Sequence, residues 1–168
     1  MKKALVAALL ALLCTMTAGA QGTEERASLK KVYDETINPM EQIDQAVAQA
    51  KSEGKFVICQ VGGNWCIWCL RFADYISRDA EISKLIDENF VYVHVNYHPR
   101  KSGDAGKAML RRLGGAGRFG YPVFVVLDGD GNVLHQQDSA YLEDGGTSYD
   151  RKKVLSFFNH WTPNAVNQ

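Results

Sequence analysis

The sequence predicts an α/β fold in which a mixed central sheet is covered by helices on both faces. Two short, apolar and β-rich segments, 56–61 and 90–95, are separated by amphipathic helical segments, which favours parallel pairing through a crossover. A later pair of segments, 123–127 and 133–135, flanks the turn Asp-Gly-Asp-Gly-Asn at 128–132 and must therefore be antiparallel. A sheet with both kinds of pairing needs helices on each face to bury it.

The elements in the first half of the chain follow from the spacing of their apolar residues. Residues 40–53 carry apolar side chains at the i, i+3, i+4, i+7 spacing of one helix face, and Gly54 follows as a helix-ending glycine. The continuous apolar run 56–61 predicts a strand that is buried on both faces. Residues 62–64 (Gly-Gly-Asn) break this strand, and helical spacing resumes over 66–76.

The second half of the chain continues the alternation of helices and strands. A second short helix is expected near Asp79, ahead of the strand at 90–95. Apolar spacing predicts further helices over 105–113 and 149–161. Residues 162–168 are polar and are expected to form a frayed tail.

The domain organisation is predicted to be a signal peptide followed by one domain. Residues 1–20 have a charged start, a short apolar run and an Ala-Gly-Ala end, the pattern of a secretory signal peptide cleaved near Ala20 and Gln21. The apolar run is about half of the roughly 20 residues that a transmembrane helix needs. Residues 21–39 are expected to be a weakly packed lead-in to a domain over 40–161. The sequence therefore predicts an exported, periplasmic protein.

Composition, charge and cysteine number exclude several classes of protein. The 168 residues are 46% hydrophobic, enough for a packed core and too apolar for a disordered chain. A formal net charge of zero argues against a nucleic-acid-binding protein, which usually has an excess of basic residues. Four cysteines are too few for a disulfide-rich scaffold, and Cys14 lies in the signal peptide. Cys59 lies in the middle of a strand and is expected to be an inert part of the core.

The strongest local motif is Cys66-Ile67-Trp68-Cys69, placed after a buried strand and at the start of a helix. The N–H groups and the dipole of a helix N-terminus stabilise a thiolate, which lowers the pKa of the first cysteine below about 8.5. Cys69 lies one turn deeper on the same face, close enough to form a small disulfide ring. The motif therefore predicts a redox pair in which Cys66 is the attacking thiol and Cys69 the resolving thiol.

The residues around this motif resemble the active-site region of the thioredoxin superfamily. Residues 56–69 resemble the active-site strand and helix of that family, 120–124 its cis-proline loop and following strand, and 128–133 its hairpin turn. The likeness covers roughly residues 40–161, with several motifs in the right order. The helix end at 50–55 is similar to exported domains related to the soluble domain of the transmembrane disulfide reductase.

The resemblance implies an enzyme, a protein thiol–disulfide oxidoreductase, and a role for each matched residue. Cys66 would be the nucleophile and Cys69 the resolving thiol, joined in a redox-active disulfide. Trp65 would shield one side of that disulfide. Pro122 would be cis and face the cysteine pair, and the backbone of Tyr121 would present a β-like edge to an extended substrate.

Two positions depart from the family pattern. Many thioredoxins have a buried acid six positions before the first cysteine, but here Gln60 occupies that position and cannot take a proton. Water or another carboxylate, with Asp74 as a candidate, would then move protons. The dipeptide Ile67-Trp68 has no histidine, which favours a reductant or general exchanger over a strong oxidant. Trp68 either forms a surface for partner contact or packs against a following helix.

The predicted function is the reduction or exchange of disulfides in substrate proteins. A membrane or soluble thiol reductant would restore the pair, and we expect a monomer with no metal, organic cofactor or nucleic acid. One alternative is a partner-binding module of the thioredoxin fold in which the pair is a structural disulfide. Another is a metal-handling protein, although zinc needs four ligands and neither Cys59 nor the four histidines form a close pair with metal-site spacing.

Overall fold

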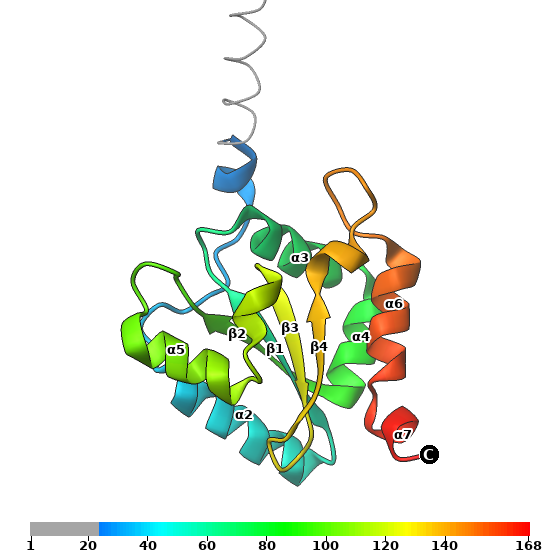
Figure 1. Ribbon diagram of the computed structural model, residues 1–168. Coiled ribbons are helices and arrows are strands. Elements are labelled where there is room, and N and C mark those ends of the chain that lie inside the picture. The colour runs from blue at the N-terminus through cyan, green and yellow to red at the C-terminus, as the bar shows by residue number, and fades with distance from the viewer. Residues whose placement is uncertain (1–23) are drawn as a thin grey trace, which may run out of the picture. The chain divides into compact units, whose positions relative to one another are not determined.

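The computed structural model in Figure 1 describes residues 24–168. Residues 24–30 belong to one unit, with a short helix over 24–28, and residues 31–168 form a second, compact unit. The expected signal peptide, 1–20, lies outside the described residues. Within the described part of the chain, no helix has the length and apolar character needed to cross a membrane.

A four-stranded sheet with the strand order β2-β1-β3-β4 forms the framework of the second unit. Strand β1 (Phe56–Gly62) pairs in parallel with β2 (Phe90–Asn96) and antiparallel with β3 (Val123–Leu127). Strand β4 (Val133–Asp138) then pairs antiparallel with β3. The mixed sheet and the α/β class are therefore as predicted.

Helices cover both faces of this sheet (Figure 1). On one face lie α2 (Pro39–Glu53) and α5 (Gly103–Arg112), whose apolar residues share a core with alternate residues of β1 and β3. On the other face, α3 (Ile67–Arg78), α4 (Ala80–Asn89) and α6 (Arg151–His160) contribute to a second core. The result is a layered structure in which β1 is buried over its whole length.

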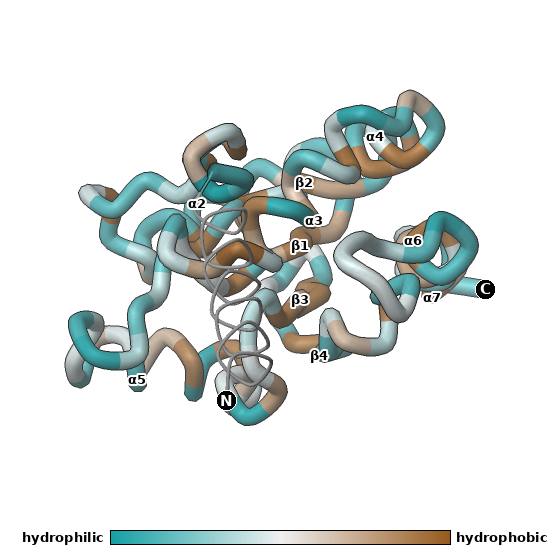
Figure 2. Tube along the Cα trace, turned by 90° about the horizontal axis from the view of Figure 1, so that it is seen from above, coloured by the Kyte–Doolittle hydropathy of each residue, from teal (hydrophilic) through white to brown (hydrophobic). Residues whose placement is uncertain are grey.

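The two cores divide the side chains of β1 by their alternation along the strand. Val57, Cys59 and Val61 lie in the core beneath α2 and α5. Phe56 and Ile58 lie in the core beneath α3, α4 and α6. In Figure 2 the strands β1 and β3 show hydrophobic colour between helices that alternate hydrophilic and hydrophobic segments. Because helices cover both faces of β1, successive side chains are all buried, and the 56–61 run therefore lacks an apolar–polar alternation.

Helix ends are set by local capping residues. The Asn38 side chain accepts a hydrogen bond from the Met40 N–H at the start of α2, and Gly54 ends that helix with a φ of 66°. Asp79 separates α3 from α4, and its carboxylate accepts a hydrogen bond from the Ile82 N–H. Asp79 therefore ends one helix and begins the next, and the second helix starts where the sequence predicts.

The N-terminal end of the domain is better packed, and its C-terminal end more regular, than the sequence predicts. Tyr33, in the lead-in, is only 4% exposed, so the prediction of weak packing is wrong at this residue. The tail forms a short helix, α7 (Pro163–Val166), instead of fraying. Thr162 caps α7 through a hydrogen bond from the Ala165 N–H, and proline is well suited to the first helical position.

The segments between the main elements contain two short 3-10 helices. One of them, η1 (Ala116–Phe119), precedes β3, and the other, η2 (Ser139–Leu142), follows β4. Tyr149 forms an isolated bridge with Glu143, so α6 begins later than predicted. Strand β4 runs three residues beyond the predicted strand because an edge strand accepts polar residues on its open side.

Candidate active site

A disulfide joins Cys66 and Cys69 at the N-terminus of α3. Cys66 is the cap residue of that helix, and its Sγ lies 3.2 Å from the Cys69 backbone nitrogen, whose N–H points at the sulfur. Cys66 keeps 7% of its surface exposed, whereas Cys69 is fully buried. Cys66 is therefore the sulfur that solvent or another protein can reach.

The loop that precedes β3 faces this disulfide. The Tyr121–Pro122 peptide bond is cis, as the resemblance implies. The carbonyl oxygen of Tyr121 lies 3.5 Å from Cys66 Sγ. The Tyr121 ring packs against Trp65 and Tyr97, and burial raises the pKa of its phenol above the ordinary value. The chain thus brings together a helix N-terminus and a cis-proline loop that are more than fifty residues apart.

Trp65 is held in place next to the pair by its indole N–H and its ring. The Nε1–H donates a hydrogen bond to the carbonyl of Tyr97, with a nitrogen–oxygen distance of 2.8 Å. Its ring makes an edge contact with Tyr121 at a centroid distance of 5.7 Å and a tilted contact with His98 at 5.5 Å. Trp65 therefore packs against the cis-proline loop on one side and the loop after β2 on the other.

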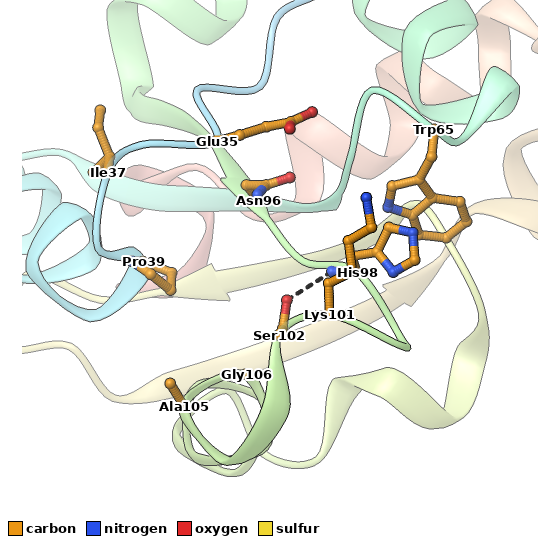
Figure 3. A pocket seen from close by; sticks show the side chains of 10 residues that line it. All are labelled: Glu35, Ile37, Pro39, Trp65, Asn96, His98, Lys101, Ser102, Ala105 and Gly106. Carbon is orange, nitrogen blue, oxygen red and sulfur yellow. Dashed lines mark hydrogen bonds between the residues drawn. The ribbon is translucent and has the colours of Figure 1, made fainter.

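A cavity of about 400 Å³ borders Trp65 (Figure 3). Its lining mixes an acid, Glu35, with a basic residue, Lys101, and with apolar side chains from the segment that leads into α2. His98 and Lys101 lie near the indole at one end, and the Ser102 hydroxyl oxygen accepts a hydrogen bond from the His98 backbone N–H at 2.8 Å. The cavity beside Trp65 is thus polar at one end, and its lining offers Glu35 to a positive group and Lys101 to a negative group.

Trp68, the second tryptophan of the motif, packs against the body of the domain. Its ring makes an edge contact with Tyr149 at 5.5 Å, and the Arg71 guanidinium lies 4.8 Å from its centroid. The Tyr149 hydroxyl also donates a hydrogen bond to the Trp68 carbonyl at 3.0 Å. Trp68 is therefore partly buried against Tyr149, which precedes α6, and part of its ring stays accessible.

Gln60 lies beneath the pair, fully buried, at the position where many thioredoxins carry an acid. Its Nε2 lies 2.9 Å from the Cys69 carbonyl oxygen and 2.6 Å from the Tyr33 hydroxyl. Its Oε1 accepts a hydrogen bond from the Tyr92 hydroxyl at 2.6 Å. All the polar atoms of this buried amide have partners, which removes most of the cost of burying it. Asp74, the alternative acid, instead pairs with Arg78 on α3.

Two further groups border this buried amide. Gly62 leaves no room for a side chain, because a Cβ there would collide with Cys69 Sγ and stand 3.0 Å from the Tyr33 hydroxyl oxygen. The ring of His94 makes edge contacts with Tyr33 and Tyr92 at 5.3 and 5.4 Å. Burial lowers the pKa of His94 to about 4, so its imidazole is neutral at physiological pH.

Cys59 lies on the opposite face of the sheet from Gln60, in the core beneath α2 and α5. It is a free thiol, and burial raises its pKa to about 12. Cys59 therefore stays protonated and is part of the core, where the sequence placed it. Among residues 24–168, no group of three or more histidine, cysteine or acidic side chains is arranged to hold a metal ion.

Comparison with known proteins identifies the family. The family model described as "Thioredox_DsbH: Protein of unknown function, DUF255" matches residues 21–162. The chain belongs to this family. Its sheet, helix order and cysteine pair make it a member of the thioredoxin superfamily, which confirms the resemblance predicted from the sequence.

Relatives of this Thioredox_DsbH chain have names from disulfide chemistry. It is 29% identical over 116 residues to "Thiol:disulfide interchange protein DsbD" of Cronobacter sakazakii, covering 69% of this chain and 18% of that protein. The protein of the same name from Colwellia psychrerythraea is 26% identical over 113 residues, covering 67% and 17%. The chain therefore spans less than a fifth of these relatives.

A solved structure shares most of the fold. The crystal structure of a disulphide isomerase from Xylella fastidiosa Temecula1 superposes with a TM-score of 0.63 and 25% sequence identity. The superposition covers 79% of this chain and 97% of that one. The comparison supports the thioredoxin-like architecture of the Thioredox_DsbH chain over nearly all of its compact domain.

Sequence reasoning missed Tyr33, Tyr92 and Asn64 as residues of the site. Asn64 pairs with the backbone of Tyr33, accepting its N–H at 3.1 Å and donating to its carbonyl at 2.8 Å. The signal available for Tyr33 was weak, since it is one aromatic residue in a polar segment without periodicity. Tyr92 belongs to a strand whose apolar run gave no reason to single out its hydroxyl.

Proposed function

We propose that the chain is an extracytoplasmic thiol–disulfide oxidoreductase that reduces or exchanges disulfides of substrate proteins through Cys66 and Cys69. The observation that carries this proposal is the position of Cys66. Its sulfur caps α3, remains partly exposed and lies 3.5 Å from the Tyr121 carbonyl beside the cis-proline. A thiolate at that place is stabilised by the helix N-terminus, so it can act as a nucleophile near neutral pH.

The reaction proceeds through a mixed disulfide. The Cys66 thiolate attacks one sulfur of the substrate disulfide, the substrate S–S bond breaks, and the other substrate sulfur leaves as a thiolate that takes up a proton. Cys69 then loses its proton and attacks Cys66 Sγ, which releases the second substrate sulfur. The substrate has gained two electrons, and the protein now holds the Cys66–Cys69 disulfide. A membrane or soluble dithiol returns the two electrons.

The surroundings of Cys66 suit a polypeptide substrate. The Tyr121 backbone offers a carbonyl at the rim of the pair, where an extended substrate segment can dock as a strand. Trp65 shields the flank of the disulfide on the side of the His98 loop. The cavity lined by Trp65, the residue that precedes Cys66 in the chain, provides space for a substrate side chain. No metal or organic cofactor takes part in these steps.

We also propose that the protein acts after export, as a monomer in the periplasm. The signal-peptide pattern of residues 1–20 supports this location. Disulfides persist in that compartment and are rare in the cytosol, so substrates for this chemistry are present there.

The test is turnover of a disulfide-bonded protein such as insulin with a chemical dithiol as reductant. We expect turnover by the unaltered protein and its loss, by about a thousandfold or more, in Cys66→Ser. Cys59→Ala is the matched control, because that thiol lies on the other face of the sheet and should leave turnover unchanged.

Two results would contradict the proposal. A reduction potential well below about −300 mV with no turnover would favour a partner-binding module with a structural disulfide. Stoichiometric zinc in the reduced protein, lost on mutation of either Cys66 or Cys69, would favour a metal-handling protein.

A further inference from the structure

The orientation of the Gln60 amide follows from its partners. A backbone carbonyl only accepts hydrogen bonds, so the NH₂ group of the amide must face the Cys69 carbonyl oxygen. Its second N–H then points at the Tyr33 hydroxyl, 2.6 Å away. Tyr92 donates its proton to the amide oxygen. Both amide hydrogens are therefore used, and the Tyr33 hydroxyl takes part as an acceptor.

The proton of the Tyr33 hydroxyl is consequently directed away from Gln60. Cys69 Sγ is a close neighbour of the hydroxyl oxygen, because a Cβ on Gly62 would collide with this sulfur and stand 3.0 Å from that oxygen. The two atoms therefore border the same point, which glycine at position 62 leaves unfilled. Glycine at position 62 thus allows a phenol to approach the buried sulfur.

The side chains around this amide are neutral at physiological pH. Burial raises the pKa of Tyr33 and Tyr92 well above their ordinary value and lowers that of His94 to about 4. These three groups come from the lead-in segment and from β2, and Gln60 from β1 has no charge. Desolvation disfavours a thiolate on buried Cys69. Because the neighbouring groups are neutral, hydrogen bonds to the thiolate must offset this cost.

We propose that Tyr33 is a positioning residue of the resolving step, whose hydroxyl donates a hydrogen bond to Cys69 Sγ when the disulfide is open and that sulfur is a thiolate. The inference rests on the proposed function of the pair. Gln60 holds the phenol oxygen in place and so contributes through Tyr33, although it cannot itself take a proton. Tyr33 keeps its proton throughout, and the proton lost by Cys69 passes to solvent.

Asn64 fixes the segment that carries Tyr33. Its side-chain amide makes two hydrogen bonds with the Tyr33 backbone, at 3.1 and 2.8 Å, much as a neighbouring strand would. Asn64 itself lies between the end of β1 and the cysteine motif. Asn64, in the loop before the cysteine motif, therefore fixes the position of Tyr33, which in turn supports Cys69.

The test measures the titration of Cys69 directly. In a Cys66→Ser background, the ultraviolet absorbance of the thiolate is followed against pH with and without Tyr33→Phe. The proposal predicts that loss of the hydroxyl reduces the thiolate fraction at a given pH about tenfold, equal to one pKa unit. Cys59 does not interfere, since its pKa of about 12 lies above the range used.

Tyr97→Phe is the matched control. It removes the hydroxyl of another buried tyrosine, whose side chain belongs to the core beneath α2 and α5 on the other face of the sheet. We expect the Cys69 titration to stay within error of the parent in this variant. An equal shift in Tyr97→Phe, or no shift in Tyr33→Phe, overturns the proposal.

A second variant reaches Tyr33 through its backbone. Asn64→Ala leaves the phenol intact but releases the segment that carries it, so it should also reduce the thiolate fraction of Cys69. Combining Asn64→Ala with Tyr33→Phe should cause no further loss, because both substitutions remove the same hydrogen bond. Additive effects in the double variant would contradict the proposal.

A rate measurement tests the same residue in the two-cysteine protein. There, Tyr33→Phe should slow the release of the mixed disulfide about tenfold while the first attack keeps its rate. The titration needs no substrate, so its failure is distinct from loss of turnover in the unaltered protein, which would refute the proposed function.

Discussion

The two sulfurs of the cysteine pair have different surroundings. Cys66, on the surface side, contacts backbone groups: the Cys69 N–H and the Tyr121 carbonyl. Cys69, on the interior side, is enclosed by Gly62 and by the hydrogen-bonded side chains beneath it. The surface side uses groups that any sequence provides at a helix N-terminus and a cis-proline loop. The interior side depends on particular side chains from three separate segments, so its chemistry is more sensitive to substitution.

The largest test of this comparison separates the roles of the two sulfurs. Cys69→Ser leaves Cys66 able to attack, but no group can then resolve the mixed disulfide. We expect turnover to fall by about a thousandfold or more while a covalent complex with the substrate accumulates. Non-reducing electrophoresis and mass spectrometry detect that complex. In Cys66→Ser no complex should form; if it does, the assignment of surface and interior sulfur is reversed.

A second test uses the neutrality of the interior side. Burial lowers the pKa of His94 from 6.5 to about 4, and its Nε2 has no hydrogen-bond partner in the described part of the chain. As the pH falls below 6.5, the unfolded chain binds a proton at this histidine and the folded protein does not. The free energy of unfolding therefore decreases between pH 6.5 and about pH 4. The full effect is about 3 kcal/mol in the free energy of unfolding.

Chemical denaturation at several pH values measures this dependence. His94→Leu should flatten the loss of stability between pH 6.5 and 4, because the titrating group is gone. Val133 offers a control because it is exposed and has no titratable group, and Val133→Thr should leave the profile unchanged. Identical profiles in the unaltered protein and His94→Leu would show that this histidine is not the source.

A third test concerns the close approach on the interior side. Gly62→Ala places a methyl group against Cys69 Sγ and the Tyr33 hydroxyl, and we expect it to cost about 1–3 kcal/mol in the free energy of unfolding. Gly129→Ala is the control, since its Cβ would meet Lys51 only at an ordinary contact distance of 3.5 Å. Equal losses from the two substitutions, measured by denaturant unfolding, would mean that the contact at Gly62 is not tight.

The smallest expected effect lies at the outer end of the cysteine motif. Tyr149→Phe removes the hydrogen bond to the Trp68 carbonyl, which should cost about 0.5–1 kcal/mol and leave the Cys69 titration unchanged. Thermal unfolding measures the stability, with the 74% exposed Tyr141 as the control in Tyr141→Phe. A shift in the titration of Cys69 would show that support from Tyr149 extends to the interior side.

Much of the site on the surface side was predictable from the sequence. The apolar run of β1, the Gly-Gly-Asn break and the cysteine spacing together predict a C-x-x-C at a helix start. The resemblance to thioredoxins added the cis peptide bond at Pro122, which the structure contains. These features are local, because a strand end, a helix cap and a turn depend on residues close together in the chain.

The interior side was predictable only at Gln60: its strand predicts that it is buried, and the resemblance to thioredoxins implies a position beneath the pair. Its partners were not predictable, because Tyr33 and Tyr92 lie 27 and 32 residues away from it. A polar lead-in has no periodicity that would show one of its residues entering the core. The prediction of a weakly packed segment failed at Tyr33 for this reason.

The sequence by itself determined the class of fold, the order of its elements and the cysteine pair, since these follow from periodicity, turn chemistry and motif spacing. Only the tertiary structure decided which neutral groups surround Cys69. Parallel pairing of β2 with β1 brings Tyr92 to Gln60, and the hydrogen bonds of Asn64 bring Tyr33 there as well. A buried amide must find partners within the fold, and their identity depends on packing between segments that are distant in the chain.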